Sequence, residues 1–450
     1  MAQRQNGMAE AIDNLVVGLG ATGLSVVRYL AARGEPFAVV DSRAEPPGLG
    51  ELAAIGMPQE IHLGAFDRDV FHRARRLIVS PGVAVSNPAI EEARAAGAEV
   101  IGDIELFARE ARAPVIAITG SNGKSTVTTL VGEMARRAGM RAAVGGNLGT
   151  PALDLLGDGA PDLYVLELSS FQLETTDSLH PRAAVVLNVS PDHMDRYASL
   201  DAYAQAKARI YARAAHCVVN RDDPLAASLV SDCARTGFGL SSPRAGDYGL
   251  IERDGGHWLA RGDMPLLAAA ELRMAGRHNL ANALAALALG YEAGLPQQAM
   301  LAALREFPGL PHRCQWVGRR DEVDWYNDSK GTNVGATLAA IEGLDGPLVL
   351  IAGGQGKGQD FAPLRTALAG RARGVLLIGV DAPRLREALD GVAPLLDAPD
   401  MPAAVALAAR LAQPGDRVLL SPACASLDMY RNYMARGDDF VRAYEGLPHG

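Results

Sequence analysis

The chain has 450 residues, enough for two or three domains of ordinary size. Its hydrophobic fraction of 48% and charged fraction of 21% are typical of globular proteins. The net charge is −9 without any run of Lys or Arg, which argues against a nucleic-acid partner because such binding normally needs a basic stripe. No apolar run approaches the ~20 residues of a membrane span, and the N-terminus lacks the apolar core of a secretory signal. We therefore expect a cytoplasmic protein without nucleic-acid or membrane partners.

The four cysteines are scattered along the chain and form no CxxC pair. They are Cys217, Cys233, Cys314 and Cys424. We expect small, buried side chains with free thiols, as in a reducing compartment.

Short apolar runs alternate with helical patterns along most of the chain, which predicts three α/β units in series with parallel sheets. In chain order, strands are expected at 14–20, 37–42, 75–83, 113–119, 162–170, 182–190, 216–224, 323–328, 347–354, 374–380 and 416–423, with a hairpin at 247–260. Helices are expected from Thr22, at 102–111, after a glycine-rich loop at 120–126 and at 276–295.

The glycine-rich loop "GSNGKST" (120–126) lies between an expected strand and an expected helix. Successive backbone N–H groups and a helix N-terminus can cradle phosphate oxygens in such a loop. Lys124 would contact the outer phosphates, and a hydroxyl of Ser125 or Thr126 would bind Mg²⁺. Gly123 would let the backbone approach without a Cβ clash. This pattern predicts a nucleoside triphosphate site, with an incidental glycine turn as the alternative.

Two candidate metal ligands follow strand ends, where the ligand sites of parallel sheets gather. Glu167 ends the apolar run "LYVLE", and His193 follows the strand expected at 182–190, beside Asp192. We expect both side chains to bind metal, although an isolated histidine is more often a packed or surface residue.

A second glycine-rich turn, "GLGATG" (18–23), precedes the phosphate loop by about a hundred residues. With Asp41 at the end of the next strand, it matches the pattern of NAD-binding domains. The later ATP-type loop and its candidate metal ligands argue against a dinucleotide.

Several motifs in order resemble those of the Mur ligases, the ATP-dependent amino-acid ligases of peptidoglycan precursor synthesis. The motifs are "TGSNGKST" (119–126), "LELSSFQLE" (166–174), "LNVSPDHMDR" (187–196), "GRHNLANALAA" (276–286), "GLPHR" (309–313), "NDSKGTN" (327–333) and "SPACASLD" (421–428). The similarity runs from about residue 14 to about residue 445. The last two motifs are most similar to those of the D-glutamate-adding members.

This resemblance implies a Rossmann-like UDP-substrate domain at 1–103, a central P-loop ATPase-type domain with a parallel or mixed sheet at 104–309, and a Rossmann-like amino-acid domain at 310–450. It implies that ATP converts the carboxylate of UDP-N-acetylmuramoyl-L-alanine to an acyl phosphate, which the amine of D-glutamate attacks. Because these groups are anionic, catalysis depends on positioning and on cations. A monomer that uses ATP and two Mg²⁺ sites is expected, with a hinge at 307–313.

Carried over residue by residue, the resemblance implies catalytic roles for Lys124, Glu167, His193 and Lys207. The ATP site would consist of Gly120, Ser121, Asn122, Gly123, Lys124, Ser125, Thr126, Asn279, Asn282, Arg313, Asp328, Lys330 and Thr332. Metal would be held by Ser125, Thr126, Glu167, His193 and Lys207, the last as its carbamate. A lysine can take up CO₂ in this way when burial and nearby cations favour its neutral form.

The same resemblance implies two substrate sites. The UDP substrate would contact Leu19, Gly20, Ala21 and Thr22 at the pyrophosphate, Asp41, Ser42 and Arg43 around the uracil, and Ser80, Gly82, Asn147 and His193 at the muramoyl and alanyl end. D-Glutamate would be bound by Lys357, Ser426, Leu427 and Tyr433.

A few positions depart from the pattern of the D-glutamate-adding members. Ser42 replaces a common Thr, Gly331 a common Ala, and Tyr433 an expected Phe, which affects the aromatic contact near the amino acid. The residues before about 11 have no counterpart and are expected to be disordered.

Other functions remain as alternatives. A sibling ligase for another amino acid, or a folylpolyglutamate synthetase, would share the ATP loop and the metal chemistry, but the folate enzyme should lack a UDP-type unit such as 14–102. A dehydrogenase would bind NADH and no UDP-sugar. A non-catalytic nucleotide-binding regulator would be expected to lose Lys124, Glu167 or His193, and all three are present.

Overall fold

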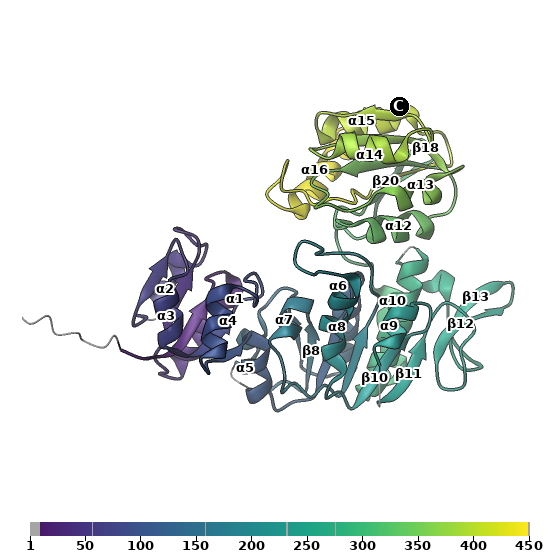
Figure 1. Cartoon of the computed structure of the whole chain (residues 1–450). Helices are drawn as coiled ribbons and strands as arrows, with labels where there is room; N and C mark the ends of the chain where they lie inside the picture. Colours follow the sequence, from purple (N-terminus) through teal and green to yellow (C-terminus); the bar gives the residue numbers. More distant parts are fainter. Residues whose placement is uncertain (1–9, 56, 158, 231–232, 275, 449–450) are drawn as a thin grey trace, which may run out of the picture.

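The computed structural model describes residues 10–55, 57–157, 159–230, 233–274 and 276–448. The disorder expected before residue 11 therefore concerns positions that lie, apart from Glu10, outside the described residues. Three β-sheets follow one another along the chain, each flanked by helices (Figure 1). This arrangement confirms the α/β fold with three domains.

The N-terminal domain is a five-stranded parallel sheet in the order β3-β2-β1-β4-β5. Its strands are β1 (Ile12–Val17), β2 (Ala38–Asp41), β3 (Ile61–Leu63), β4 (Ala74–Val79) and β5 (Glu99–Ile101). Its helices are α1 (Ala21–Ala32), α2 (Leu49–Ile55), α3 (Arg68–Arg73) and α4 (Pro88–Ala95). The strand order reverses between β1 and β4, and ligands of such sheets bind in the crevice beyond the carboxyl ends of the strands at this point. The "GLGATG" turn follows β1 and therefore lies at that crevice.

The central domain is built on a nine-stranded mixed sheet in the order β14-β13-β12-β11-β10-β9-β6-β8-β7. Between β7 and β12 in this sheet order, every pair of neighbouring strands is parallel. β13 and β14 add an antiparallel edge, and the expected hairpin consists of β12 and β13. The strands are β6 (Val115–Thr119), β7 (Ala142–Gly146), β8 (Leu163–Glu167), β9 (Ala183–Val186), β10 (His216–Asn220), β11 (Ala234–Phe238), β12 (Tyr248–Arg253), β13 (Gly256–Arg261) and β14 (Met264–Ala268).

Helices cover both faces of the central sheet. They are α5 (Asp103–Glu110), α6 (Lys124–Arg137), α7 (Ser170–Glu174), α8 (Leu200–Ala208), α9 (Pro224–Ser228), α10 (Arg277–Glu292) and α11 (Gln297–Glu306), with the 3₁₀ segments η1 (Ala152–Leu155), η2 (Arg209–Tyr211) and η3 (Ala269–Glu271). One apolar core joins α6, α10 and α11 to one face of the sheet. The core on the other face is continuous with the core around α1 of the N-terminal domain.

The C-terminal domain is a six-stranded sheet in the order β15-β16-β20-β17-β18-β19, in which only β15 runs antiparallel among the described strands. Its strands are β15 (Gln315–Arg320), β16 (Val323–Asn327), β17 (Leu348–Gly353), β18 (Ala372–Ile378), β19 (Leu395–Asp397) and β20 (Arg417–Leu420). Its helices are α12 (Val334–Gly343), α13 (Ala362–Leu368), α14 (Ala382–Leu389), α15 (Met401–Leu411) and α16 (Tyr433–Glu445). The domain lies above the central domain in Figure 1, and α12 packs against α10.

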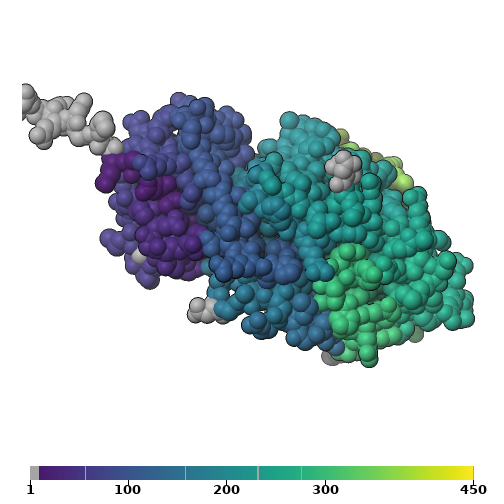
Figure 2. Space-filling model, turned by 90° about the horizontal axis from the view of Figure 1, so that it is seen from below, coloured from purple at the N-terminus to yellow at the C-terminus, as the bar shows by residue number. Residues whose placement is uncertain are grey.

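Ion pairs from α1 and from the residue that follows it join the N-terminal and central domains. Arg28 makes two contacts to Asp154, Nε–Oδ1 at 3.1 Å and Nη2–Oδ2 at 2.5 Å, and Arg33 lies 3.0 Å from Glu110. Seen from below, the purple N-terminal domain lies at one end of the molecule against the blue and teal central domain (Figure 2). These contacts fix the orientation of α1, and with it the turn that precedes α1.

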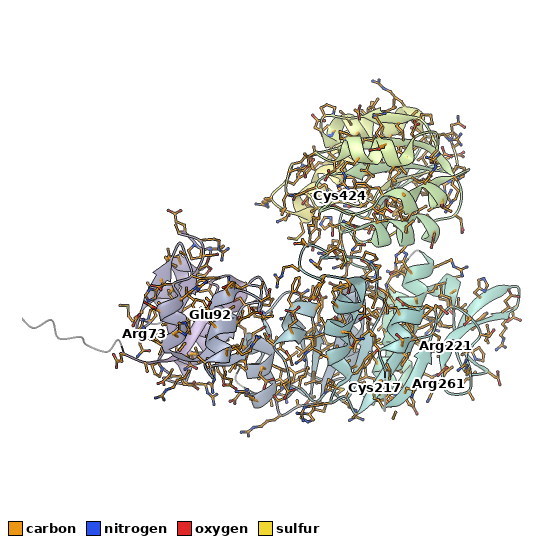
Figure 3. All side chains as sticks on the ribbon, viewed as in Figure 1. Arg73, Glu92, Cys217, Arg221, Arg261 and Cys424 are labelled. Carbon is orange, nitrogen blue, oxygen red and sulfur yellow. A yellow bond between two sulfur atoms is a disulfide. The ribbon has the colours of Figure 1, made fainter. Side chains whose placement is uncertain are left out.

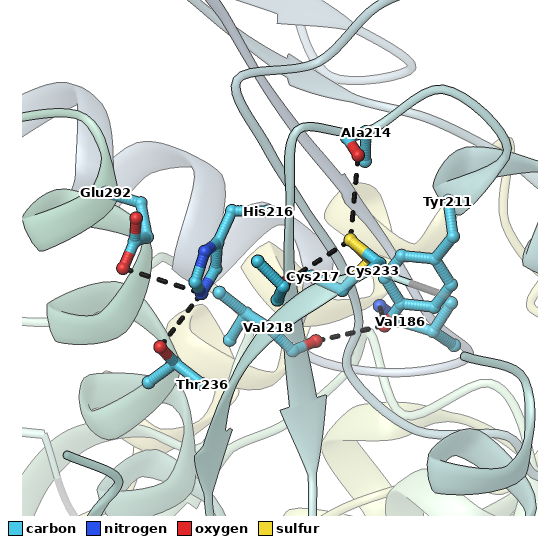
Figure 4. The surroundings of a disulfide bond; sticks show 10 residues. Val186, Tyr211, Ala214, His216, Cys217, Val218, Cys233, Thr236 and Glu292 are labelled. Atoms are coloured by element: carbon cyan, nitrogen blue, oxygen red, sulfur yellow. Dashed lines mark hydrogen bonds and ion pairs between the residues drawn. A yellow bond between two sulfur atoms is a disulfide. The ribbon is translucent and has the colours of Figure 1, made fainter. Parts of the chain in front are cut away.

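Two of the four cysteines contradict the expectation of free thiols. Cys217 on β10 and Cys233, just before β11, form a disulfide with their Cα atoms 6.0 Å apart (Figure 4). They are 16 residues apart in sequence, and the parallel pairing of β10 with β11 brings them together. Cys314 and Cys424 are buried and free as expected, and Cys424 lies in the C-terminal domain, far from Cys217 (Figure 3).

Arg436 on α16 holds the loop after β16 from inside the C-terminal domain. Its side chain is 1% exposed and donates to Ser329 Oγ at 3.0 Å, to the Ser329 carbonyl at 2.8 Å and to the Cys424 carbonyl at 3.1 Å. Burial lowers the pKa of the guanidinium to about 10. The loop that carries Asp328 and Lys330 is therefore anchored by one buried cation.

We expect Arg436→Met to lower the free energy of unfolding by about 3 kcal/mol, because it leaves buried carbonyl groups without their charged donor. Denaturant unfolding of both proteins measures the change. The matched control is Arg410→Met, at an exposed position on α15, which should change the stability by less than about 0.5 kcal/mol. Equal effects of the two substitutions would contradict the anchoring role.

Candidate active site

The phosphate loop between β6 and α6 has the geometry of an anion site. Gly123 adopts a φ of 84°, and a Cβ there would lie 2.5 Å from Asn282 Oδ1, so only glycine fits this close approach. The α6 helix begins at Lys124 and presents its free N–H groups to the loop. The expectation of a strand, a glycine-rich loop and a helix in direct succession is confirmed.

Lys124 lies folded along this loop. Its Nζ donates to the Gly120 carbonyl at 2.8 Å and to the Ser121 carbonyl at 3.0 Å. Burial lowers the pKa of its ammonium, while Glu167 and Asp192 oppose that shift. Two backbone carbonyls thus accept hydrogen bonds from the ammonium. A phosphate oxygen could take their place as a stronger, charged acceptor.

Glu167, at the end of β8, has one satisfied and one unsatisfied oxygen. Asn147 Nδ2 donates to its Oε1 at 2.7 Å, whereas Oε2 is buried without a hydrogen-bond partner. The side chain is 3% exposed. A buried, partnerless carboxylate oxygen is costly unless a cation or donor completes it. The donor set therefore fits a hard divalent cation such as Mg²⁺.

His193 lies in the loop after β9, next to Asp192 in the chain. Its backbone is in the left-handed region with a φ of 57°, and its Nε2 lies 3.7 Å from Asp192 Oδ2. The ring packs edge-on against Phe171, with 4.9 Å between centroids. Burial lowers the pKa of the imidazole, and the nearby ammonium groups of Lys357, Lys124 and Lys207 lower it further. Only the neutral imidazole can bind a metal, and this environment favours it.

Lys207, on α8, is 1% exposed. Its Nζ donates to the Gly120 carbonyl at 3.0 Å and lies 4.3 Å from the centroid of the Tyr203 ring. Burial lowers its pKa well below the ordinary value, and the charge of Lys124 adds to this effect. The solvated helix charge that its spacing alone would indicate is therefore excluded.

Lysine is rare in this chain. Only four of its 43 Lys and Arg residues are lysine, and all four are candidate site residues. Lys124, Lys207 and Lys357 each lower the pKa of His193, and Lys124 also lowers that of Lys330, which burial brings to about 8. The four ammonium groups therefore gather around one site.

A cleft of about 290 Å³ lies between the phosphate loop, α10 and the C-terminal domain. The residues expected at the ATP site that line it are Asn122, Gly123, Thr126, Asn279, Asn282, Arg313, Asp328 and Lys330. Asn282 Nδ2 donates to Asn279 Oδ1 at 3.1 Å, so the two asparagines share one face of α10 as expected. Gly120, Ser121, Lys124, Ser125 and Thr332 belong to the same loops but do not line the cleft.

Arg313 and Asp328 bring the C-terminal domain into this cleft. Arg313 Nη2 donates to Ser125 Oγ at 2.7 Å, which places the guanidinium at the start of α6. Asp328 accepts from Ser421 Oγ at 2.7 Å, and burial raises its pKa to about 7. A Cβ on Gly331 would lie 2.5 Å from Asp328 Oδ2, so an alanine at this position would have to displace that carboxylate.

A second cavity of about 570 Å³ lies beyond the carboxyl ends of β1 and β4. The residues expected at the UDP site that line it are Gly20, Ala21, Thr22, Asp41, Ser42, Arg43, Ser80, Gly82 and Asn147. Leu19 is fully buried and donates its N–H to Asp41 Oδ2 at 2.7 Å, and His193 does not line the cavity. Asn147 links the two regions, since it lines this cavity and donates to Glu167.

The four residues expected at the D-glutamate site all lie in the C-terminal domain but line neither cavity. Lys357 has a left-handed φ of 50°, Ser426 is buried and Leu427 is 66% exposed. The centroid of the Tyr433 ring lies 4.2 Å from Lys330 Nζ, so the tyrosine contacts the loop that lines the ATP cleft. A phenylalanine would offer the same ring face to this ammonium.

Several lining residues were missed by sequence reasoning. Phe66 and Gln172 line the second cavity, and Asn188, Ser190 and His278 line the cleft. Gln172, Asn188, Ser190 and His278 belong to motifs that were recognised, so the motifs were a usable signal. Phe66 lies outside every motif.

No three His, Cys, Asp or Glu side chains gather closely enough to hold a metal ion among the residues that the structure describes. Glu167 and His193 are therefore an incomplete ligand set by themselves. No helix in the same described ranges is long and apolar enough to cross a membrane.

Comparisons with known proteins assign these three domains to an enzyme class, the ATP-dependent ligases. Residues 13–102 match the family "Mur ligase MurD-like, N-terminal domain", 118–290 match "Mur ligase middle domain", and 312–424 match "Mur ligase, glutamate ligase domain". The chain belongs to the Mur ligase family.

Curated relatives narrow the comparison to one type of enzyme. The UDP-N-acetylmuramoylalanine--D-glutamate ligase of Nitrosococcus oceani is 58% identical over 438 residues, which cover 96% of each chain. The enzyme of that name from Pseudomonas aeruginosa is 56% identical and covers 96% of this chain and 98% of its own.

Solved structures show the same fold. The MurF ligase of Thermotoga maritima in complex with ADP has a TM-score of 0.61 at 16% identity, covering 97% of this chain and 95% of its own. The UDP-N-acetylmuramate-alanine ligase MurC of the same organism has a TM-score of 0.60 at 21% identity, covering 96% and 99%.

Asp41 provides a pH test of the second cavity. Arg43 donates to both of its oxygens, at 2.9 and 2.7 Å, and these bonds lower the carboxyl pKa from 3.8 to about 2. A lowered pKa means that the folded state favours the charged form. The stabilisation is therefore complete above about pH 4 and is lost as the pH falls from 4 towards 2.

We expect Asp41→Asn to lower the free energy of unfolding by about 1–2 kcal/mol at pH 7. The expected change is smaller than the pKa shift alone would give, because the Arg43 side chain is half exposed and solvent screens the interaction. Denaturant unfolding across pH should show this difference narrowing below pH 4. Asp13→Asn, at an exposed position on β1, is the control and should show little difference at any pH. A difference for Asp41→Asn that is independent of pH would contradict the electrostatic origin.

Proposed function

We propose that this ligase adds D-glutamate to UDP-N-acetylmuramoyl-L-alanine at the expense of ATP, a cytoplasmic step of peptidoglycan synthesis. One observation carries the proposal: Asn147 lines the second cavity and also donates to Glu167, and the charge of Glu167 opposes the burial that lowers the pKa of Lys124 in the phosphate loop. An acid bound in the second cavity would thus end where a triphosphate ends. The identity of 58% to a curated D-glutamate ligase over 96% of both chains supports the choice of substrates.

The UDP substrate would bind with its pyrophosphate at Gly20, Ala21 and Thr22, where the N-terminus of α1 offers free N–H groups. Its uracil would lie near Asp41 and Arg43, which brace each other by a two-point ion pair. The muramoyl and alanyl end would then extend past Ser80, Gly82 and Asn147, with His193 at its far end.

ATP would bind in the cleft with its phosphates on residues 120–126 and its base near Asn279 and Asn282. Lys124 would exchange its two loop carbonyls for the outer phosphates, and Arg313 would reach them from the C-terminal domain. Asp328, Lys330 and Thr332 would close the cleft from that domain. The substrate carboxylate would then attack the terminal phosphorus, and ADP would leave.

Magnesium would be held by Glu167, His193, Ser125 or Thr126, and Lys207 as its carbamate. The unpartnered Oε2 of Glu167 and the neutral imidazole of His193 fit this role. Mg²⁺ bound there would offset the negative charge that develops on the phosphoryl oxygens. Because the two side chains alone are an incomplete set, a carboxylate on Lys207 would add the missing oxygen ligands.

D-Glutamate would bind to the C-terminal domain through Lys357, Ser426, Leu427 and Tyr433. Its amine would attack the acyl phosphate, the tetrahedral intermediate would collapse, and phosphate would leave. Tyr433 touches Lys330, so the amino-acid site and the ATP cleft share a contact within this domain. We expect a monomer to suffice, because all these residues lie in one chain.

The decisive experiment follows phosphate release by the purified protein with ATP and Mg²⁺. We expect release only when UDP-N-acetylmuramoyl-L-alanine and D-glutamate are both present, since the amine is needed to expel phosphate. Glu167→Gln should lower kcat at least 100-fold by weakening cation binding, while Glu133→Gln, at a surface ion pair on α6, should not. Equal turnover with L-lysine or meso-diaminopimelate would overturn the choice of D-glutamate. NADH binding without UDP-sugar binding would favour a dehydrogenase.

The carbamate on Lys207 can be tested directly because the chain holds so few lysines. In ¹³C-bicarbonate we expect one carbamate NMR signal that is absent from Lys207→Arg, since burial favours the neutral amine that CO₂ attacks. Lys207→Arg should also lose at least 100-fold in kcat, although it keeps the positive charge. A signal that persists in Lys207→Arg, or full activity of that variant, would contradict the modification.

A further inference from the structure

Asn333 is a buried side chain that joins two domains at the ATP cleft. It is the last residue of "NDSKGTN" and the N-cap of α12, where its Oδ1 accepts from the Ala336 N–H at 2.8 Å. Its side-chain amide also contacts two residues of the central domain. Nδ2 is 3.3 Å from Asn122 Oδ1 and 3.3 Å from Asp192 Oδ2, and Asn122 Nδ2 is 3.5 Å from Asn333 Oδ1.

The two partners of Asn333 belong to the two loops that would hold phosphate and metal. Asn122 is in the phosphate loop, and Asp192 directly precedes His193. The approach of α12 to these loops is close, since a Cβ on Gly335 would lie 2.7 Å from Ser190 Oγ. One amide from the C-terminal domain therefore bonds both loops of the central domain.

The first turn of α12 also holds the loop that carries Lys357. The Val334 N–H donates to Gln359 Oε1 at 2.9 Å, and Gln359 Nε2 donates to the Gly356 carbonyl at 3.1 Å. Lys357 lies between these two contacts with its left-handed backbone. A displacement of α12 would thus displace the Lys357 loop.

We propose that Asn333 is a positioning residue that couples closure of the ATP cleft to the placement of the amino-acid-binding loop. The connection runs from Asn122 and Asp192 through Asn333 and Val334 to Gln359, and from there to Lys357. The identity of the amino acid as D-glutamate rests on the proposed function. The coupling itself rests on the contacts of Asn333.

Capping alone does not explain this residue. Asp400, the N-cap of α15 in the same domain, makes the equivalent bond to the Ala403 N–H at 2.8 Å, and it has no amide to offer another domain. A serine can cap a helix as well as asparagine does. Serine is too short to keep the bonds to Asn122 and Asp192 as well. Asn333→Ser therefore separates the two roles.

The test measures the steady-state kinetics of Asn333→Ser and Asn333→Ala for each substrate. We expect the KM for D-glutamate to rise about tenfold and kcat to fall in both variants, with the KM for the UDP substrate unchanged. Asp400→Ser is the matched cap control and should leave all constants as in the wild type. Thermal unfolding should show Asn333→Ala less stable than Asn333→Ser, because only serine keeps the cap.

A second variant keeps the proposal falsifiable if the first ones fold poorly. Gln359→Leu removes the acceptor of the Val334 N–H and should also raise the KM for D-glutamate about tenfold. The double variant Asn333→Ser/Gln359→Leu should be little worse than either single variant, because both cut one connection.

The proposal is overturned if Asn333→Ser has wild-type kinetics, if the KM values for both substrates rise equally, or if the effects of Asn333→Ser and Gln359→Leu multiply independently. These results differ from a failure of the proposed function. In that case the wild-type protein itself would show no phosphate release that depends on D-glutamate.

Discussion

The central constraint on this molecule is the repulsion between its anionic ligands. A carboxylate, a triphosphate and the intermediate between them must meet on a chain whose net charge is −9. The chain meets this constraint by concentrating cations, and all four of its lysines are candidate residues of one site. Arginine is used more widely, at Arg313 in the cleft and in ion pairs such as Arg28 with Asp154 and Arg373 with Asp416. Lysine is kept where a compact point charge or a neutral amine is useful.

The same constraint explains why residues from several domains share the site. Glu167 and Lys124 come from the central domain, Arg313 and Lys330 from the C-terminal domain, and Asn147 connects them to the cavity of the N-terminal domain. An active site built across domains can admit three large substrates and then exclude water when the domains close. Contacts such as those of Asn333 then become as important as the groups that touch the substrates.

The sequence predicted the buried parallel strands well and the edges poorly. β6 and β8 are continuous apolar runs, because helices cover both of their faces. β15 exposes Trp316 and Arg319 and buries only Gly318, and β3, β5 and β19 have three residues each, so hydrophobic pattern alone did not reveal them. The disulfide was also missed, since it depends on the pairing of β10 with β11.

In the site, local pattern was sufficient for the phosphate loop and for Glu167 at a strand end. The role of Lys207 could be predicted only from the family resemblance. A single charged residue on a helix is expected to face solvent, and its burial depends on tertiary packing that the local sequence does not reveal. Asn333 was missed for a related reason. Its sequence signal is complete as a helix cap, and its contacts to Asn122 and Asp192 exist only when the domains are together.

The apolar cores divide the chain differently from its sheets. One core runs without a break from Val16 and Leu30 to Leu166 and Tyr203, across the first two domains. The C-terminal domain has cores of its own, which begin at Cys314. Heat should therefore unfold the first two domains as a single cooperative unit and the third domain as a separate one. The transition of the third domain should shift most when a nucleotide binds between these two units.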